Sequence, residues 1–528
     1  MTSSAYEVAR LGFITLLPEI LLILTATAMT TAGAFVKLPR RLWCASAAAA
    51  MALALLLLLT TGHQPLDPYG SVVLNDAFAG YGRALFLLSG LVVLALAHDQ
   101  VEEARAPEFF GALLFINAGS MIVASSNELI FLFVGLELVS IPTYLLLYLP
   151  KRSPTTQEAA TKYFFLSIFS SGLLLFGLAY LYGLTGVSNL KAQTFLATHV
   201  IGTPNGSLGL IALVFVTAGL GFRVAAVPFH FYAPDVYQGS PTVLAAVLSW
   251  VPKAVGFMAF LRVITSLIAA AGPDAVIGQR AVLLAWLIAV ITMTLGNTVA
   301  LYQTNLKRLL AYSSIAHAGY LMVGVAVAFQ DTDATQGLYF GAEGILFYLT
   351  AYALMTLGAF GAIIMLSTSD RTVESVDDLA GLGRTHPLAA LGLAVCLFSL
   401  AGIPPLAGFW GKFELFAAAF SVTSEANRSL FWWLAVIGVL NSAVGAYYYL
   451  KIIVAMCLAD PAGEPLRPRA GWPTTLAVLA CSGLSLMLGL YPAPILRATR
   501  AAAVAAVSVP DPFGDPGPVA VAPATAAE

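Results

Sequence analysis

Charged residues are scarce in this sequence, since Asp, Glu, Lys and Arg make up only 10% of its 528 residues. The basic residues are spread over short loops and the formal net charge is -2, which excludes a nucleic-acid partner. Cysteine is equally rare. Cys44, Cys396, Cys457 and Cys481 lie in or beside apolar segments without CxxC or Cys/His spacing, so neither a disulfide framework nor a metal site is predicted.

The sequence also lacks the motifs that bind nucleotides or catalytic metals. It contains no GxxxxGK[ST] phosphate loop, no HExxH, and no GxGxxG that opens a helix after a strand. The fragment from Gly219 to Gly221 lies inside an apolar segment and is no dinucleotide fingerprint. The chain must therefore take energy from a partner or act as a secondary exchanger.

What the sequence has in excess is hydrophobic residues, at 59%, with a mean hydropathy of +0.87. A membrane span takes roughly 20 apolar residues, and about 14 such segments follow one another with little chain left for a soluble domain. We therefore predict an all-α polytopic membrane protein. The predicted spans are 11–36, 42–61, 84–97, 108–125, 128–149, 159–184, 207–227, 240–268, 281–301, 309–329, 338–368, 386–421, 429–458 and 472–492.

The ends of the chain carry three further predictions. The first apolar segment is too long for a secretory signal peptide and lacks its charged start and cleavage site, so it is expected to be a retained span. Basic residues are more numerous in the loops that follow odd-numbered spans, which places both termini outside the cytoplasm. The Pro- and Ala-rich end of the chain has few large hydrophobes and is predicted to be disordered.

Two apolar segments are interrupted in a similar way, at Ala225–His230 and at Ala401–Leu406. Proline removes a backbone donor and clashes with the preceding turn, so both segments are predicted to be broken membrane helices. Broken helices in matching positions indicate an ion or substrate path. A weak echo between residues 162–177 and 307–324 suggests a duplicated bundle of about five helices per half.

Several charged residues fall within or beside the predicted spans, where each costs roughly 2.5 to 3.5 kcal/mol on insertion scales. Glu137 is flanked on both sides by apolar residues, and Lys162 begins the next apolar run. Lys162 can extend to the membrane interface, or it can be the cation that holds Glu137 ionised. Glu137 itself is either a functional acid or a hydrogen-bonded structural one.

Lys253 is the most telling charge, because it lies well away from any loop. A lysine with no route to water is suited to accepting and releasing protons, although a permanent pair with a buried acid is the alternative. His230 and His317 also lie in apolar settings, and Lys412 follows the second interruption. These residues are spaced over successive spans, which favours a lateral proton relay over a catalytic pocket.

Three stretches resemble one known family. VPFHFYAPDVYQGSP, LKRLLAYSSIAHAGYLMVG and SLAGIPPLAGFWGKF are similar to the N subunit of the proton-pumping NADH:quinone oxidoreductase, respiratory complex I. The similarity runs over residues 11–492, and the form from Pro234 to Pro241 distinguishes this subunit from related Mrp-type antiporter subunits. The resemblance implies 14 transmembrane helices with two inverted five-helix repeats and two discontinuous helices.

The resemblance also implies a division of the chain and a setting for it. We expect N-terminal transmembrane helices at 1–107, antiporter-like repeats at 108–268 and 279–458, a C-terminal transmembrane helix at 459–500 and a disordered tail at 501–528. The implied setting is a bacterial inner membrane, in contact with lipid and with other membrane and peripheral subunits of complex I. No cofactor is expected in this chain, whereas NADH, FMN, iron–sulfur clusters and quinone are implied in partner subunits.

By the same resemblance, Glu137 corresponds to the coupling glutamate and Lys162 to its modulating lysine. Lys253 corresponds to the central relay lysine and Lys412 to the exit-side lysine, while His230 and His317 correspond to histidines on the hydrated axis. The seven predicted relay residues are Glu137, Lys162, Arg223, His230, Lys253, His317 and Lys412.

Arg223 departs from the family pattern, which has lysine at this position. Because arginine stays protonated, Arg223 is expected to act as a fixed cation near Glu137 or as a gate that does not titrate.

Two other function classes stay open at this stage. A cation/proton antiporter of the Mrp type would exchange sodium without NADH oxidation, and a structural membrane subunit would tolerate neutral residues at Glu137 and Lys253.

Overall fold

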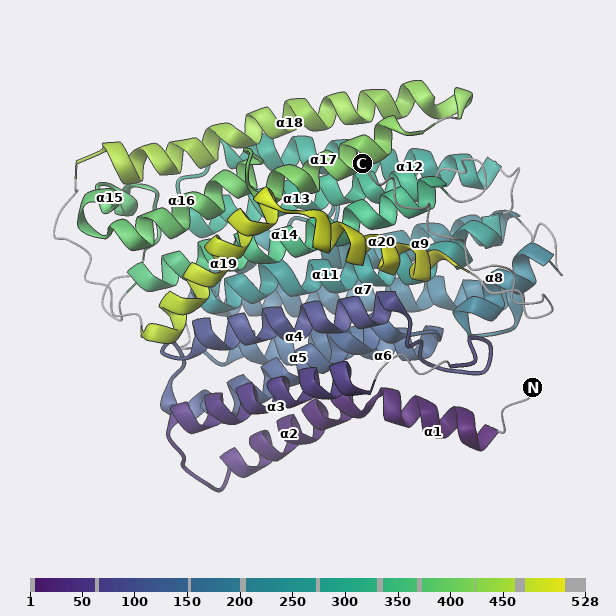
Figure 1. Cartoon of the computed structure of the whole chain (residues 1–528), viewed down its shortest axis with the longest axis horizontal. Helices are drawn as coiled ribbons and strands as arrows, with labels where there is room; N and C mark the ends of the chain where they lie inside the picture. Colours follow the sequence, from purple (N-terminus) through teal and green to yellow (C-terminus); the bar gives the residue numbers. More distant parts are fainter. Residues whose placement is uncertain are drawn as a thin grey trace, which may run out of the picture.

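The computed structural model describes residues 5–61, 66–150, 153–199, 206–271, 276–329, 336–367, 373–422, 424–460 and 471–508. These residues form a bundle of α-helices (Figure 1). Within the described ranges the only strand-like pairings are isolated bridges, such as the one between Val73 and Ser126. The predicted all-α fold is confirmed.

Eleven helices are long and apolar enough to cross a membrane, and up to 13 spans result if two bent pairs each count as one. Helix α9 (Gly206–Val224) is a shorter apolar helix in addition. The eleven long helices are α3 (Arg40–Thr60), α4 (Ala77–Ala97), α5 (Ala106–Ser125) with the short helix before it, α6 (Leu129–Tyr148), α7 (Pro154–Thr185), α11 (Thr242–Ala271), α12 (Val276–Ala300), α13 (Leu306–Ala328), α14 (Gln336–Leu366), α18 (Glu425–Leu458) and α19 (Trp472–Leu490).

The first predicted span is bent. Helices α1 (Ala5–Thr15) and α2 (Leu17–Gly33) meet at 60° around Leu16. Pro18 lies in the first turn of α2, where its missing N–H costs nothing but where it prevents α1 from continuing straight into α2.

Both predicted discontinuous helices are confirmed. Helix α9 ends at Val224 and the chain resumes helix only at α10 (Ala233–Gly239). Helix α16 (Pro387–Ala401) is likewise followed by a non-helical turn and then by α17 (Ala407–Phe420). Each break falls at the proline-containing interruption that the sequence predicted.

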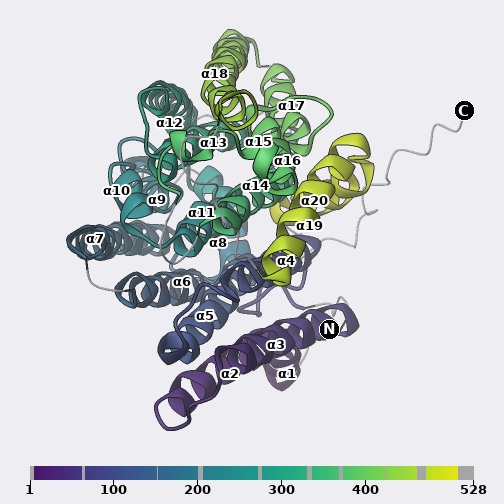
Figure 2. The ribbon, with the colours of Figure 1, turned by 90° about the vertical axis from the view of Figure 1, so that its left-hand side faces the viewer.

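Helices α11, α13 and α14 form the interior of the bundle. About nine-tenths of the apolar window of each helix is buried, and in the end-on view they lie inward of α7, α12 and α18 (Figure 2). Small residues allow the closest crossings. A Cβ on Gly296 of α12 would lie 2.6 Å from the backbone nitrogen of Ala316 in α13, so α12 and α13 pack backbone against backbone.

The described chain ends in a further helix after the last predicted span. Helix α20 (Ala493–Val507) follows α19 and packs against α14 and α4 (Figure 1). Residues 501–507, which we predicted as part of the disordered tail, are therefore helical, since this alanine-rich stretch has high helix propensity. Residues 509–528 of the predicted tail lie outside the described residues.

Candidate functional site

The break between α9 and α10 is stabilised by neighbouring side chains. The backbone N–H of Val227 donates to Thr292 Oγ1 on α12 at 3.0 Å, and the Tyr232 hydroxyl donates to the carbonyl of Phe222 at 3.0 Å. A backbone freed from its helix at membrane depth needs such partners. The interruption is therefore built into the protein interior.

The break between α16 and α17 is stabilised by a lysine. Lys412 Nζ donates to the carbonyls of Leu400 at 3.1 Å and Ala401 at 2.9 Å, which are the last carbonyls of α16. Gly402 supplies the left-handed turn that follows, with φ 85°. A cation at a helix C-terminus is also favoured by the helix dipole. Lys412 thus holds the second discontinuity as well as lying on the predicted relay.

Glu137 on α6 forms an ion pair with Arg223 at the end of α9. The distance from Arg223 Nη2 to Glu137 Oε1 is 2.7 Å, and Ser171 of α7 donates to the same carboxylate oxygen at 2.5 Å. The guanidinium also donates to the carbonyl of Leu136 and to Ser140. Arg223 is 7% exposed and Glu137 22%, so the pair is largely withdrawn from the surface.

Lys162 does not form this pair. Its amine lies 2.6 Å from Asp235 Oδ2 and 2.5 Å from Glu158 Oε1, while Asp235 also binds Arg308 of α13 at 2.6 Å. The position of Lys162 explains the difference: nine residues separate it from Ser171 on α7, which corresponds to about 13 Å along the helix. Arg223, and not Lys162, is the cation beside Glu137.

Lys253 on α11 is 1% exposed. Among the described residues its amine has no hydrogen-bond acceptor and no carboxylate partner. The neighbouring turn of α11 lies directly against the first break, because a Cβ on Gly256 would approach Val224 to 2.6 Å and the Cβ of Arg223 to 3.6 Å. An isolated buried ammonium is costly, and no described group offsets that cost at Lys253.

His317 on α13 is the centre of a hydroxyl network. Its Nδ1 bonds the hydroxyl of Tyr348, and its Nε2 lies 2.9 Å from the hydroxyl of Tyr449, which in turn bonds Ser313. The side chain is 1% exposed.

His317 also lies within electrostatic range of both Lys412 and Lys253. The Lys412 amine stands 4.9 Å from the ring centroid of Tyr320, one turn from His317 on the same helix.

His230 lies apart from this network. It sits in the turn between α9 and α10 and is half-buried, and its Nδ1 has no hydrogen-bond partner among the described residues. Within the part of the chain that the structure describes, no hydrogen bond or ion pair joins His230 to another predicted relay residue.

Sequence reasoning missed several polar residues that complete the site. They are Asp235, Ser140, Ser171, Tyr320, Tyr348 and Tyr449. Asp235 lies in the stretch VPFHFYAPDVYQGSP, and a negative charge beside an apolar segment was the available signal. The tyrosines gave no such signal, since a tyrosine in an apolar helix is more often a packing residue.

Five of the seven predicted relay residues are mostly or fully withdrawn from the surface: Glu137, Arg223, Lys253, His317 and Lys412. Side chains of these types are suited to accepting, releasing or steering protons. Among the described residues no cluster of three or more His, Cys, Asp or Glu could hold a metal ion, and the four cysteines are free.

Comparison with known proteins identifies the family of this chain. The family model described as NADH:quinone oxidoreductase/Mrp antiporter, TM, matches residues 126–444. The chain belongs to this family. Subunit N of NADH-quinone oxidoreductase from Trichlorobacter lovleyi is 39% identical over 492 residues, which cover 91% of this chain and 95% of that protein. Subunit N from Rhodospirillum rubrum is 38% identical, with coverage of 93% and 96%.

Solved structures agree with the sequence comparison. A chain of respiratory complex I from Thermus thermophilus with bound aureothin matches with a TM-score of 0.74 and 34% identity, covering 92% of this chain and all of that chain. A chain of the Mrp complex from Dietzia sp. matches with a TM-score of 0.77 at 22% identity, which shows a shared fold. The resemblance to the subunit N family is confirmed.

Proposed function

We propose that this chain is the membrane subunit N of a NADH:quinone oxidoreductase and that it translocates protons across the membrane. The observation that carries the proposal is Lys253, a residue 1% exposed whose amine has no partner among the described residues, on a helix that packs directly against the first break. The family membership and the coverage of subunit N relatives support the setting in complex I.

In the proposed mechanism, Arg223 is a fixed positive charge. It keeps Glu137 paired while protons reach Lys253. When the pair between Glu137 and Arg223 opens, the free Glu137 carboxylate attracts the proton on Lys253 or pairs with another group. When the pair closes again, Lys253 loses that attraction and its proton moves onward. The pair lies where α6, α7 and α9 meet, so in this proposal a small movement of one of these helices opens or closes it.

The second half of the path uses the hydroxyl network. The hydroxyl groups of Tyr348 and Tyr449 hold the two ring nitrogens of His317 and so fix the orientation of its ring. A proton that leaves Lys253 reaches Lys412 by way of this ring or of neighbouring hydroxyl groups. Lys412 then releases the proton toward the other side of the membrane. Lys162, Asp235 and Arg308 form a charged cluster beside the first break, and His230 lies within that break; we assign both to the entry side.

The energy for transport comes from partner subunits in this proposal. Moving one charge against the membrane potential takes about 2.3 kcal/mol per 100 mV. NADH, FMN, iron–sulfur clusters and quinone belong to those partners, and none is bound by this chain. A relative in Methanosarcina mazei, 38% identical, is named F(420)H(2) dehydrogenase subunit N. We infer that the partner subunits determine which electron donor the complex oxidises. The proposed location is the inner membrane of a bacterium.

The test is a gentle purification of the chain from its native membrane. We expect NADH:quinone reductase activity and peripheral subunits to purify with it. A single-chain preparation that exchanges sodium for protons in liposomes without NADH would contradict the proposal and favour an antiporter.

A further inference from the structure

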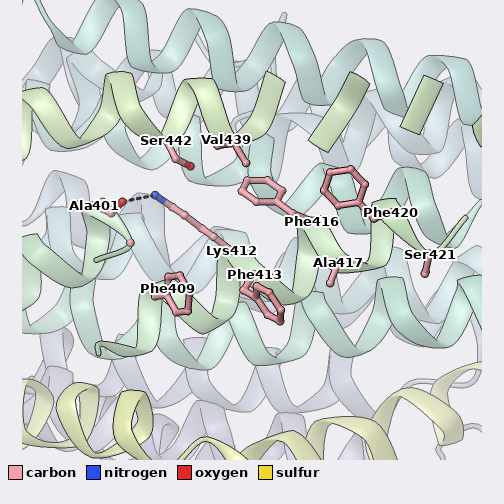
Figure 3. A pocket seen from close by; sticks show the side chains of 11 residues that line it. Ala401, Phe409, Lys412, Phe413, Phe416, Ala417, Phe420, Ser421, Val439 and Ser442 are labelled. Carbon is pink, nitrogen blue, oxygen red and sulfur yellow. Dashed lines mark hydrogen bonds between the residues drawn. The ribbon is translucent and has the colours of Figure 1, made fainter. Parts of the chain in front are cut away.

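A cavity of about 680 Å³ lies between α17 and α18 (Figure 3). Its floor is a stripe of phenylalanines on α17: Phe409, Phe413, Phe416 and Phe420. Their spacing of four, three and four residues places them on one face of the helix, over about 16 Å of its length. The cavity is therefore a long apolar slot with a size typical of small-molecule sites.

Lys412 lines the inner end of this slot. Its side chain extends to Ala401 at the break, as Figure 3 shows, and the residue is only 6% exposed. No carboxylate lies within ion-pair distance of its amine among the residues that the structure describes. The other polar lining residues are Ser421 and Ser442.

Three buried arginines differ from Lys412 because each of them pairs with a carboxylate. Arg83 pairs with Glu19 at 2.6 Å, Arg223 with Glu137 at 2.7 Å and Arg262 with Asp76 at 2.8 Å. Burying a cation is costly unless an anion accompanies it. Lys412 is a buried basic side chain with carbonyl partners only, and it stands at the end of a slot wide enough for a ligand, so an acid that reaches the slot would supply both a proton and the missing anion.

We propose that this slot binds one long-chain fatty acid, with its carboxylate at Lys412 and its alkyl chain along the phenylalanine stripe. A single alkyl chain matches the single stripe, and a carboxylate supplies the missing anion. A phospholipid fits less well, because its headgroup stays at the membrane interface whereas Lys412 lies inside the broken span.

The fatty acid enters without moving net charge into the bilayer. It crosses lipid as the neutral acid, and at the end of the slot the carboxyl group loses its proton to an unprotonated Lys412 amine. One O–H bond breaks and one N–H bond forms, which leaves a carboxylate and an ammonium in contact. If the proposed function is correct, the bound acid also holds Lys412 protonated and prevents it from passing protons; binding itself does not depend on that function.

Binding is tested on the purified complex in lipid nanodiscs with a diazirine derivative of palmitic acid. After illumination, we expect label on peptides of α17 and α18, and competition by unlabelled palmitic acid at least tenfold better than by hexadecanol, a difference of about 1.4 kcal/mol. Equal competition by the alcohol, or no label on these helices, would overturn the proposal.

Two variants and one control test the slot and the amine separately. Ala417→Trp fills the slot and should lower labelling at least tenfold, whereas Ala443→Trp, an exposed position on α18 that does not line the slot, should leave labelling as in the wild type. Lys412→Gln should keep the labelling but remove the preference for the acid over the alcohol. If the Ala417→Trp complex does not assemble, the Lys412→Gln comparison decides alone. Wild-type labelling in assembled Ala417→Trp complex would refute the site, and an unchanged acid preference in Lys412→Gln would refute the role of the amine.

Discussion

Replacing Arg223 by alanine removes a side chain that reaches from the end of α9 to both α6 and α7 at the level of Glu137. The guanidinium contacts the Glu137 carboxylate at 2.7 Å, the Leu136 carbonyl at 3.1 Å and the Ser171 hydroxyl at 3.2 Å. After the substitution Glu137 keeps only the hydrogen bond from Ser171. A largely buried carboxylate then has no cation.

The cost follows from this geometry. Removing one partner of a buried ion pair typically costs 3–5 kcal/mol, because the other charge stays buried. Glu137 is 22% exposed and keeps a hydroxyl donor, so we expect the lower end, about 3 kcal/mol. Arg223→Lys keeps the charge but loses the planar fork, and should cost about 1 kcal/mol.

The free energy of unfolding of the purified full-length chain, measured by SDS titration in mixed micelles, gives these values directly. Adding Glu137→Gln to Arg223→Ala should recover about 2 kcal/mol, since no unpaired charge remains. Arg10→Ala, at an exposed position on α1, serves as the control and should change stability by less than about 0.5 kcal/mol. A double variant no more stable than Arg223→Ala would refute the ion-pair reasoning.

Two further predictions concern packing and pH. Gly408→Ala should sharply lower the amount of chain in the membrane on immunoblots, because the added Cβ would lie 1.8 Å from the Ser399 carbonyl oxygen; Gly172→Ala, with open space around it, should not. Lys191 lies on α8 (Leu190–His199), outside the spans, and donates to the carbonyls of Ala506 and Ser508. Burial, and to a smaller extent the positive charge of nearby Arg262, lowers the pKa of Lys191 to about 8. Between pH 8 and 10.5 the unfolded chain binds more protons than the folded one, so unfolding free energy should rise with pH by up to about 3 kcal/mol, and Lys191→Met should flatten that rise. An equal slope in both proteins would contradict this assignment.

The fold was largely predictable because membrane insertion leaves a strong trace in sequence. Long apolar runs predicted the spans, and the two proline-containing interruptions predicted the broken helices at α9 and α16. The bend at Leu16 was not predicted, and residues 501–507 were predicted as a tail although they continue helix α20. The bend depends on how α1 and α2 pack, and the end of α20 depends on helix propensity in a short alanine-rich segment.

The site was predictable only in part. Cost in lipid identified Glu137, Lys253 and Lys412 as unusual, and the structure places the last two in electrostatic range of His317. Their partners could not be read from the sequence, since pairing depends on the relative height of residues on different helices. Arg223 ended beside Glu137 and Lys162 beside Asp235 for that reason.

Lys253 is proposed to carry protons through the membrane, and the number of protons pumped per electron in reconstituted complex tests this role most directly. With Lys253→Ala in an assembled, NADH-oxidising complex, we predict a lower ratio than in the wild type. Lys451→Ala, an exposed lysine on α18 away from the relay, should leave the ratio unchanged. An undiminished ratio in intact Lys253→Ala complex would contradict the account.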